Sequence, residues 1–299
     1  MKTLILNSQN VVPNSGNSKF IYNFPQGGYT MNEDLIAVQE ISMYFSAFNI
    51  TAAYKNNSFS YIWVDGTVNQ VNIPDSFLQL ADINAFMRSV MYGNGHYMVA
   101  TTGDVYFLEM VINQSQYAVQ VNNYLISVAI AAANTWTLPA SATWVLPTNP
   151  ILPYLVVPAT NNFGLLIGFE AGQYPAGVIT GIPPAQVQTP AFTSSQSELS
   201  TKAPQITPYS SFLVFCSLVN NRAVIPSQLF FSFTPTDTTF GALQTYQPNA
   251  ELGWNKVENG TYNSFVVEFR DQFGGQVAFQ DPNTLITLYT KNKNELIIK

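Results

Sequence analysis

The strongest constraint on the fold is the way in which apolar residues group along the chain. Aromatic and β-branched residues occur in short runs, separated by clusters of Asn, Gly and Pro. This pattern is typical of an all-β sandwich or barrel. The candidate strands lie at residues 3–6, 20–24, 35–48, 59–64, 212–219, 228–233, 242–246, 264–269, 276–279 and 285–289. We therefore expect a fold dominated by β-strands.

The longest of these runs predicts an irregular strand. Across residues 35–48, the apolar residues Ile36 and Val38 occupy even positions, whereas Ile41 and Met43 occupy odd ones. A regular strand keeps one parity on its buried face, so this change indicates a bulge or bend within the run.

The middle of the chain carries a different pattern. Six apolar residues recur at helical spacing, at Phe77, Leu80, Ile83, Met87, Val90 and Met91. Ser76 and Gln79 are placed for a capping box, and Gly93 supplies a stop signal. These signals predict one helix over about residues 77–92. Further on, residues 174–208 are rich in Pro, Gln, Ser and Thr, which predicts a linker or an extended arm.

Strands at both ends of the chain indicate that one sandwich is split by an insertion. The first 65 residues offer only about four strands, which alone would leave open sheet edges and a half-built core. We expect a sandwich from residues 1–68 and 206–299, and an inserted domain from residues 69–205. The inserted domain would be β-rich, with the one helix and the Pro-rich linker. Two sequential domains are the alternative.

Charge is unusually sparse. Only 9% of the residues are Asp, Glu, Lys or Arg, against about a quarter in an average domain, and the net charge is −6. A nucleic-acid binder needs a basic stripe to displace counterions from phosphates, so we expect no direct nucleic-acid binding. Neutral amides and hydroxyls suit a surface that packs against other protein, because charge is depleted from interface cores.

The residues used in catalysis and metal binding are correspondingly few. His96 is the single histidine, and a zinc site would need partners that the sequence does not supply, so we expect a solvated turn histidine. A glycosidase-type carboxylate pair stays open by count alone. Candidates near aromatic residues are Asp65, Glu109, Glu170, Glu268, Asp271 and Asp281. Asp65 and Asp281 occupy ordinary turn positions, and Glu109 and Glu268 lie within strands. We expect no catalytic residue, no cofactor and no metal, and a protein that is not an enzyme.

The single cysteine, Cys216, lies in an apolar run, and we interpret it as a buried strand residue. A chain without a disulfide favours a reducing compartment, and the first residues lack the pattern of a signal peptide.

The four tryptophans and sixteen tyrosines could form platforms for ligand stacking, and two tryptophans are the best candidates. Trp136 and Trp144 lie eight residues apart among prolines. They would provide a sugar-stacking platform of the kind found in jelly-roll lectins. In the alternative interpretation, which we prefer, they anchor an irregular segment in the core or at a subunit contact.

Six segments together resemble one family of viral proteins. They lie at residues 6–13, 41–50, 59–66, 161–169, 225–233 and 279–285. In order and in sequence they are similar to the minor capsid, or penton, proteins of virophages, polinton-like viruses and related large DNA viruses. The resemblance implies a single jelly roll of eight main strands, with an extra domain inserted between two of them.

The resemblance also implies a function. Five copies would close each five-fold vertex of an icosahedral virion, as a homopentamer that contacts the major capsid protein. The protein would be made in the host cytoplasm and reside in the virion. The major capsid protein of such viruses is a double jelly roll, for which 299 residues are too few. The alternative function is a carbohydrate- or receptor-binding jelly-roll module for host attachment, with a host-surface receptor or glycan as its partner.

Overall fold

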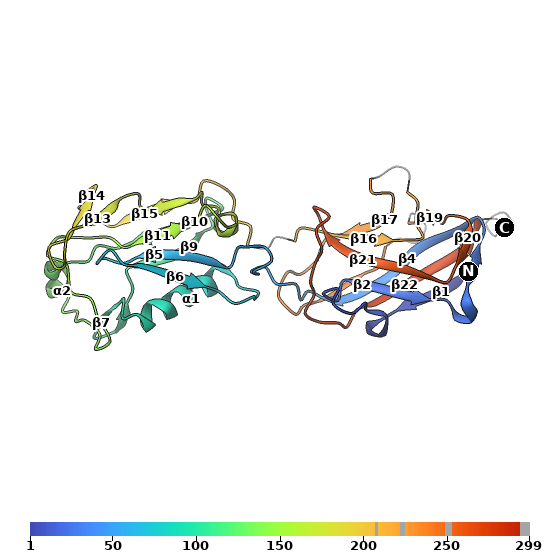
Figure 1. Ribbon diagram of the computed structural model, residues 1–299, viewed down its shortest axis with the longest axis horizontal. Coiled ribbons are helices and arrows are strands. Elements are labelled where there is room, and N and C mark those ends of the chain that lie inside the picture. Colours follow the sequence, from blue (N-terminus) through green and yellow to red (C-terminus); the bar gives the residue numbers. More distant parts are fainter. Residues whose placement is uncertain (207–208, 222–224, 249–252, 294–299) are drawn as a thin grey trace. The chain divides into compact units, whose positions relative to one another are not determined.

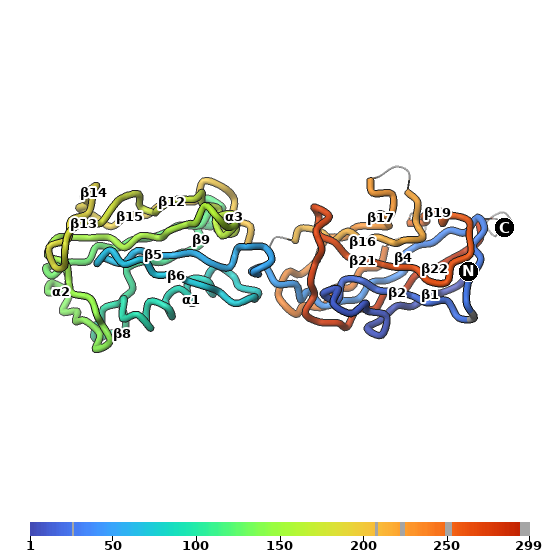
Figure 2. Tube along the Cα trace, viewed as in Figure 1, coloured from blue at the N-terminus to red at the C-terminus, as the bar shows by residue number. Residues whose placement is uncertain are grey.

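The apolar runs at the two ends of the chain form strands of one unit, and the middle of the chain forms a second unit (Figure 1). The computed structural model describes residues 1–206, 209–221, 225–248 and 253–293. Met1–Phe48 and Thr207–Lys299 make up the first unit, here the sandwich unit. Asn49–Ile206 make up the inserted unit. In Figure 2 the sandwich unit accordingly combines blue N-terminal strands with orange and red C-terminal ones.

The insertion begins earlier than the residue 69 expected from the sequence. Strand β5 (Ser58–Ile62) pairs with β6 (Val68–Asn72) and with β11 (Tyr154–Val157), so residues 49–68 join the inserted unit. The two ends of this unit meet: the buried Asn49 side chain donates from Nδ2 to the carbonyl of Ile206 at 2.7 Å.

Two antiparallel sheets build the sandwich unit. The first has the strand order β1-β22-β4-β18, and a short strand, β19, also pairs with β4. The second has the order β17-β16-β21-β2. Their bounds are β1 Lys2–Leu6, β2 Lys19–Asn23, β4 Asp34–Tyr44, β16 Phe212–Cys216, β17 Leu229–Phe233, β18 Leu243–Tyr246, β19 Asn255–Lys256, β21 Ser264–Asp271 and β22 Leu285–Asn292. Eight main strands in these two orders have the connectivity of a jelly roll, and the inserted unit interrupts it between β4 and β16. A separate pair joins β3 (Tyr29–Met31) and β20 (Gly260–Tyr262).

The irregularity predicted in the long strand is confirmed. In the pairing of β22 with β4, Thr287 opposes Glu40 but the next residue, Leu288, opposes Val38. The register therefore shifts by one residue of β4, which is a β-bulge. The bulge keeps both halves of the apolar pattern on the buried face: Ile36 and Val38 before it, Ile41 and Met43 after it.

Aromatic side chains fill the space between the two sheets. The Phe212 ring from β16 lies 6.2 Å from Phe45, which follows β4, and 5.5 Å from Phe279. Cys216, at the end of β16, is fully buried, as the sequence predicted, and burial raises the pKa of its thiol to about 12.

The inserted unit holds two main sheets and two hairpins. The sheet orders are β15-β10-β9 and β12-β11-β5-β6, and the hairpins pair β7 with β8 and β13 with β14. The remaining bounds are β7 Met98–Ala100, β8 Gly103–Val105, β9 Leu108–Asn113, β10 Ala118–Asn123, β12 Gly172–Tyr174, β13 Val178–Thr180, β14 Val187–Thr189 and β15 Gln196–Leu199. The unit has its own apolar core, which includes Phe59, Trp63, Met87 and Phe163.

Three helices occur in the inserted unit as described, where the sequence predicted one. Helix α1 (Leu80–Gly93) confirms the predicted helix with a later start, and its capping box joins Gln79 to Asp82 instead of Ser76 to Gln79. Helices α2 (Val128–Ala133) and α3 (Phe163–Ile167) have only six and five residues. Such lengths span fewer than two turns, too few for a helical repeat to stand out in the sequence.

The Pro-rich segment is not a free linker. Its strands β13 and β14 pair with each other, and β15 pairs with β10. Gln188 is buried, and its side chain accepts from the N–H of Leu152 and donates to the Leu152 carbonyl. The Gln188 side chain thus satisfies the backbone N–H and carbonyl of Leu152, as a neighbouring strand would do. Such bonds let a polar, Pro-rich segment pack against the rest of the unit. The end of this segment, residues 207–208, and the tail at residues 294–299 lie outside the described residues.

Candidate functional site

A cavity of about 650 Å³ opens in the inserted unit. Its walls come from α1, β8, β9, α2 and the residues that follow β10. Four of its lining residues are aromatic and three are charged: Tyr106, Phe107, Tyr124, Trp136, Arg88, Asp104 and Glu109. Ligand pockets in proteins have about this volume and combine apolar walls with a few polar groups.

Glu109 is the centre of the polar wall. Its neighbours in β9, Leu108 and Met110, face the core, so the alternation of a strand turns Glu109 to the opposite side. Arg88 of α1 donates to Oε2 at 2.8 Å. The Tyr124 hydroxyl donates to Oε1 at 2.6 Å, and Asn122 Nδ2 donates to the same atom at 3.1 Å.

These bonds give the site a fixed geometry. Hydrogen bonds to a carboxylate are among the strong ones, and three donors from one helix and one sheet hold Glu109 in place. Burial, reinforced by the hydrogen bond and charge of Glu109, raises the pKa of Tyr124 to about 12. Tyr124 is therefore a neutral hydrogen-bond donor at neutral pH.

Trp136 belongs to the apolar wall. It follows α2, and its backbone N–H donates to the carbonyl of Ala131 at 3.0 Å. The indole packs edge-to-face on Phe107 with ring centroids 5.6 Å apart, and it is only partly buried. On the other side of the cavity, the Arg88 guanidinium lies 5.2 Å from the centre of the Tyr106 ring. The Trp136 ring and the Arg88 guanidinium thus each contact the ring of a second lining residue.

Trp144 does not share the cavity with Trp136. Its side chain is buried, its indole N–H donates to the carbonyl of Gly95 at 2.7 Å, and its ring meets Trp63 edge-to-face. No face of Trp144 is open to a ligand, because core side chains occupy its surroundings. For this residue, the structure favours the anchoring role over the stacking role.

His96 is not the solvated turn residue that the sequence led us to expect. It is buried, stacks on Trp63 with ring centroids 4.8 Å apart, and shares a 2.8 Å hydrogen bond between Nδ1 and the Tyr61 hydroxyl. Burial lowers its pKa to about 4, so the imidazole is neutral at neutral pH. The Gly-Asn-Gly sequence before it does form a turn, but the aromatic residues that cover it come from elsewhere in the sequence.

Most of the other candidate carboxylates have local structural roles. Asp65, Asp271 and Asp281 each accept backbone N–H groups in turns, from Thr67, from Phe273 and Gly275, and from Asn283 respectively. Glu268 pairs with Arg270 at 3.1 Å, and Glu170 pairs with Lys202 at 3.3 Å. Among the six candidates, Glu109 alone lines the cavity.

The described residues contain no group of three or more His, Cys, Asp or Glu side chains arranged to hold a metal ion. Within the same residues, no helix is long and apolar enough to cross a membrane.

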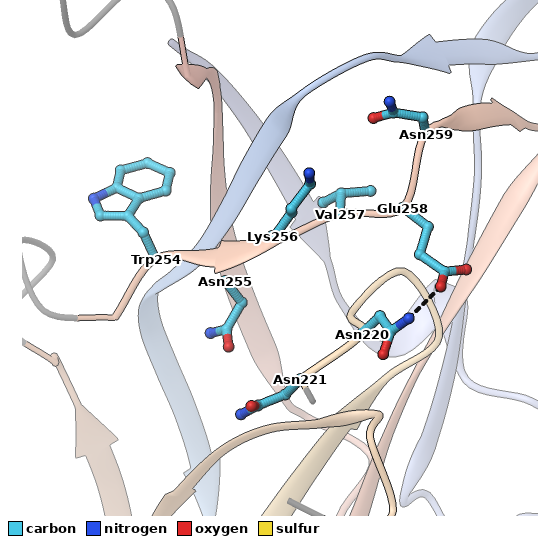
Figure 3. Close-up of a pocket in the computed structure, with 8 residues that line it drawn as sticks. All are labelled: Asn220, Asn221, Trp254, Asn255, Lys256, Val257, Glu258 and Asn259. Atoms are coloured by element: carbon cyan, nitrogen blue, oxygen red, sulfur yellow. Dashed lines mark hydrogen bonds between the residues drawn. The ribbon is translucent and has the colours of Figure 1, made fainter. Parts of the chain in front are cut away.

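A second hollow, of about 760 Å³, lies on the sandwich unit (Figure 3). It is lined by Asn220, Asn221 and residues 254–259, and Figure 3 shows the hydrogen bond from Asn220 to Glu258 within it. Lys256 pairs with Glu33 at 3.2 Å. The lining residues border, in sequence, residues 222–224 and 249–252, which the structure does not describe. We assign no ligand to this hollow.

The sandwich unit is therefore a single jelly roll, and it carries a β-rich inserted unit that contains the cavity. Comparison with protein-family models and with curated proteins finds no match. Among solved structures, the chain is similar to the mavirus penton protein, with 11% identity, 97% of this chain and 96% of that chain covered, and a TM-score of 0.45. It is also similar to a chain in the cryo-EM structure of the Sputnik virophage, with 12% identity, complete coverage of both chains and a TM-score of 0.37. Likeness at this level leaves the function of the chain to be argued from its own sequence and structure.

Proposed function

We propose that this chain is a capsid protein, the penton subunit that forms a homopentamer at the five-fold vertices of an icosahedral virion. The observation that carries the proposal is one eight-stranded jelly roll interrupted between β4 and β16 by a folded unit. This is the arrangement implied by the resemblance of the six sequence segments to virophage penton proteins. In such a virion, its neighbours would be other copies of the chain and the major capsid protein.

The outer face of the first sheet of the sandwich unit supports association. Leu243 of β18 lies opposite Tyr44 of β4, and Leu285 of β22 lies opposite Ser42, two residues before Tyr44. Ile5 of β1 lies opposite Thr287, two residues after Leu285. The four apolar side chains are all exposed, and strand alternation places them on the face away from the buried Met43. Contiguous exposed apolar side chains are typical of an interaction surface.

The placement of charge is compatible with such a surface. The side chains of four ion pairs, Arg88–Glu109, Lys202–Glu170, Lys256–Glu33 and Arg270–Glu268, are each at least one-fifth exposed. Burying an unpaired charge at a subunit contact is costly, whereas neutral amides and hydroxyls can hydrogen-bond across it. A ring of five joins one face of a subunit to a different face of the next, so each copy needs two such surfaces.

The test is the mass of the purified chain in solution. Native mass spectrometry and sedimentation velocity should show a species of five times the 33.0 kDa chain mass. A stable monomer or trimer over the whole accessible concentration range would contradict the pentamer. That result would favour the alternative function, a carbohydrate- or receptor-binding module.

A further inference from the structure

The proposed role at the five-fold vertex assigns no function to the cavity of the inserted unit. Contacts between its own lining residues support it: Trp136 packs edge-to-face on Phe107, and the Arg88 guanidinium lies over the Tyr106 ring. Tyr106 in turn stacks on the buried Tyr97, with ring centroids 5.9 Å apart. Flat apolar surfaces of this kind pack well against the C–H face of a sugar ring.

The polar groups of the cavity include hydroxyls that a ligand can reach. Ser194 and Ser195 line the cavity and are exposed, so their hydroxyls are accessible to a ligand.

The charge balance opposes an anionic ligand. Asp104 and Glu109 contribute two carboxylates to the lining, whereas Arg88 contributes a guanidinium that is already paired with Glu109. An anionic ligand would meet net negative charge, which opposes its binding. A purely apolar ligand would desolvate the charged groups and hydroxyls of the lining without offering them hydrogen bonds in return.

We propose that the cavity binds a neutral hexose unit of a glycan. The ring packs against Trp136, and its hydroxyls hydrogen-bond to the carboxylate of Glu109, the guanidinium of Arg88 and the hydroxyl of Ser195. A volume of about 650 Å³ accommodates such a unit together with part of the next one in a chain. The proposal concerns the inserted unit alone and does not depend on assembly into pentamers.

The experiment uses the purified full-length chain on a glycan array that carries both neutral and sialylated glycans. Saturation-transfer NMR with free galactose, glucose and mannose then measures binding to single hexoses. We expect retention on neutral glycans, and a loss of affinity of about tenfold for Trp136→Ala, since one aromatic contact is removed. Trp136→Phe, which keeps an aromatic surface, should retain more of the affinity than Trp136→Ala.

Two further variants guard against a loss of folding. Ser195→Ala removes an exposed hydroxyl, which accepts the N–H of Leu125 at 3.4 Å, and should weaken binding several-fold. Tyr117→Ala removes a 74% exposed aromatic side chain that does not line the cavity, and it should bind as the unaltered chain does. The proposal is overturned if no neutral glycan is retained, if only sialylated glycans bind, or if folded Trp136→Ala and Ser195→Ala bind without loss. None of these results bears on the oligomeric state, which the mass measurement tests separately.

Discussion

At the scale of single residues, His96 couples the stability of the inserted unit to pH. The pKa of its imidazole is about 4 in the folded chain, below the ordinary value of 6.5, because burial penalises the charged form. The unfolded chain therefore takes up a proton at higher pH than the folded chain does. The contribution of His96 is fully present above about pH 6.5 and is lost as the pH falls toward 4.

We expect this loss to amount to on the order of 2 kcal/mol of unfolding free energy, after a discount for partial solvent screening. Urea titrations between pH 7 and pH 4, followed by tryptophan fluorescence, measure it, because Trp63 stacks directly on the imidazole. His96→Gln removes the titrating group, so the pH dependence of the variant should be shallower over this range. Equal slopes for the two proteins would contradict the assignment of the pH dependence to His96.

The sequence could predict whether a residue is buried only where residues close to it in the chain surround it. Cys216 lies within an apolar strand, so its burial followed from local pattern. The burial of His96 depends on Trp63, which lies 33 residues earlier in the chain. The role of Trp144 depends on Gly95, which lies 49 residues earlier. For the same reason, the network around Glu109 was not predicted: Arg88 belongs to a helix, and Tyr124 follows another strand. The one available signal was a glutamate between two apolar residues of a strand.

At the scale of elements, the end of helix α3 depends on one glycine. Gly168 has a φ of +78°, and a Cβ at this position would lie 2.2 Å from the carbonyl oxygen of Lys202. The same glycine also accepts a hydrogen bond from the N–H of Lys202 at 3.1 Å. Both the left-handed conformation and the close approach exclude a side chain here.

Gly168→Ala should therefore destabilise the inserted unit by about 2–4 kcal/mol. Gly93→Ala is the matched control, because Gly93 ends helix α1 with nothing within 4 Å of a built Cβ. This control should be neutral or stabilising by up to about 1 kcal/mol. Thermal unfolding of the two variants measures the difference, and similar midpoints for both would contradict the role of Gly168.

Elements with a long periodic signal were predictable, and short ones were not. Helix α1 and the bulge of β4 follow from the spacing of apolar residues over more than ten positions. The start of the insertion was not predictable, because β5 has the composition of any sandwich strand and only its pairing with β6 and β11 places it in the inserted unit. The Pro-rich segment pairs through strands of three or four residues, whose partners no local pattern reveals.

At the scale of the whole molecule, the outer face of the first sheet predicts where association can be broken. Leu243 is 55% exposed, and Leu243→Lys would place a charge on this apolar face. If the face is a subunit contact, the charge must be desolvated on assembly, so the pentamer should weaken by tenfold or more, about 1.4 kcal/mol. Sedimentation velocity over a dilution series measures this change.

The control for this variant is Ile182→Lys, which adds the same charge to an 82% exposed apolar position of the inserted unit. It should assemble as the unaltered chain does. Pentamers of equal stability in both variants would show that the outer face is not a subunit contact. They would not contradict the formation of pentamers.

The hydrogen bond from Asn49 to Ile206 has a consequence for how such a protein can diversify. One side-chain hydrogen bond joins the two ends of the inserted unit, so these ends lie close together. The unit can therefore be inserted between two neighbouring positions of the jelly roll. Any other domain whose termini lie equally close could be spliced at the same place without changing the strand register on either side. The sequences of the jelly roll and of the inserted unit can then change at different rates. The jelly roll is constrained by the packing of its strands, and the inserted unit by the molecules that it contacts.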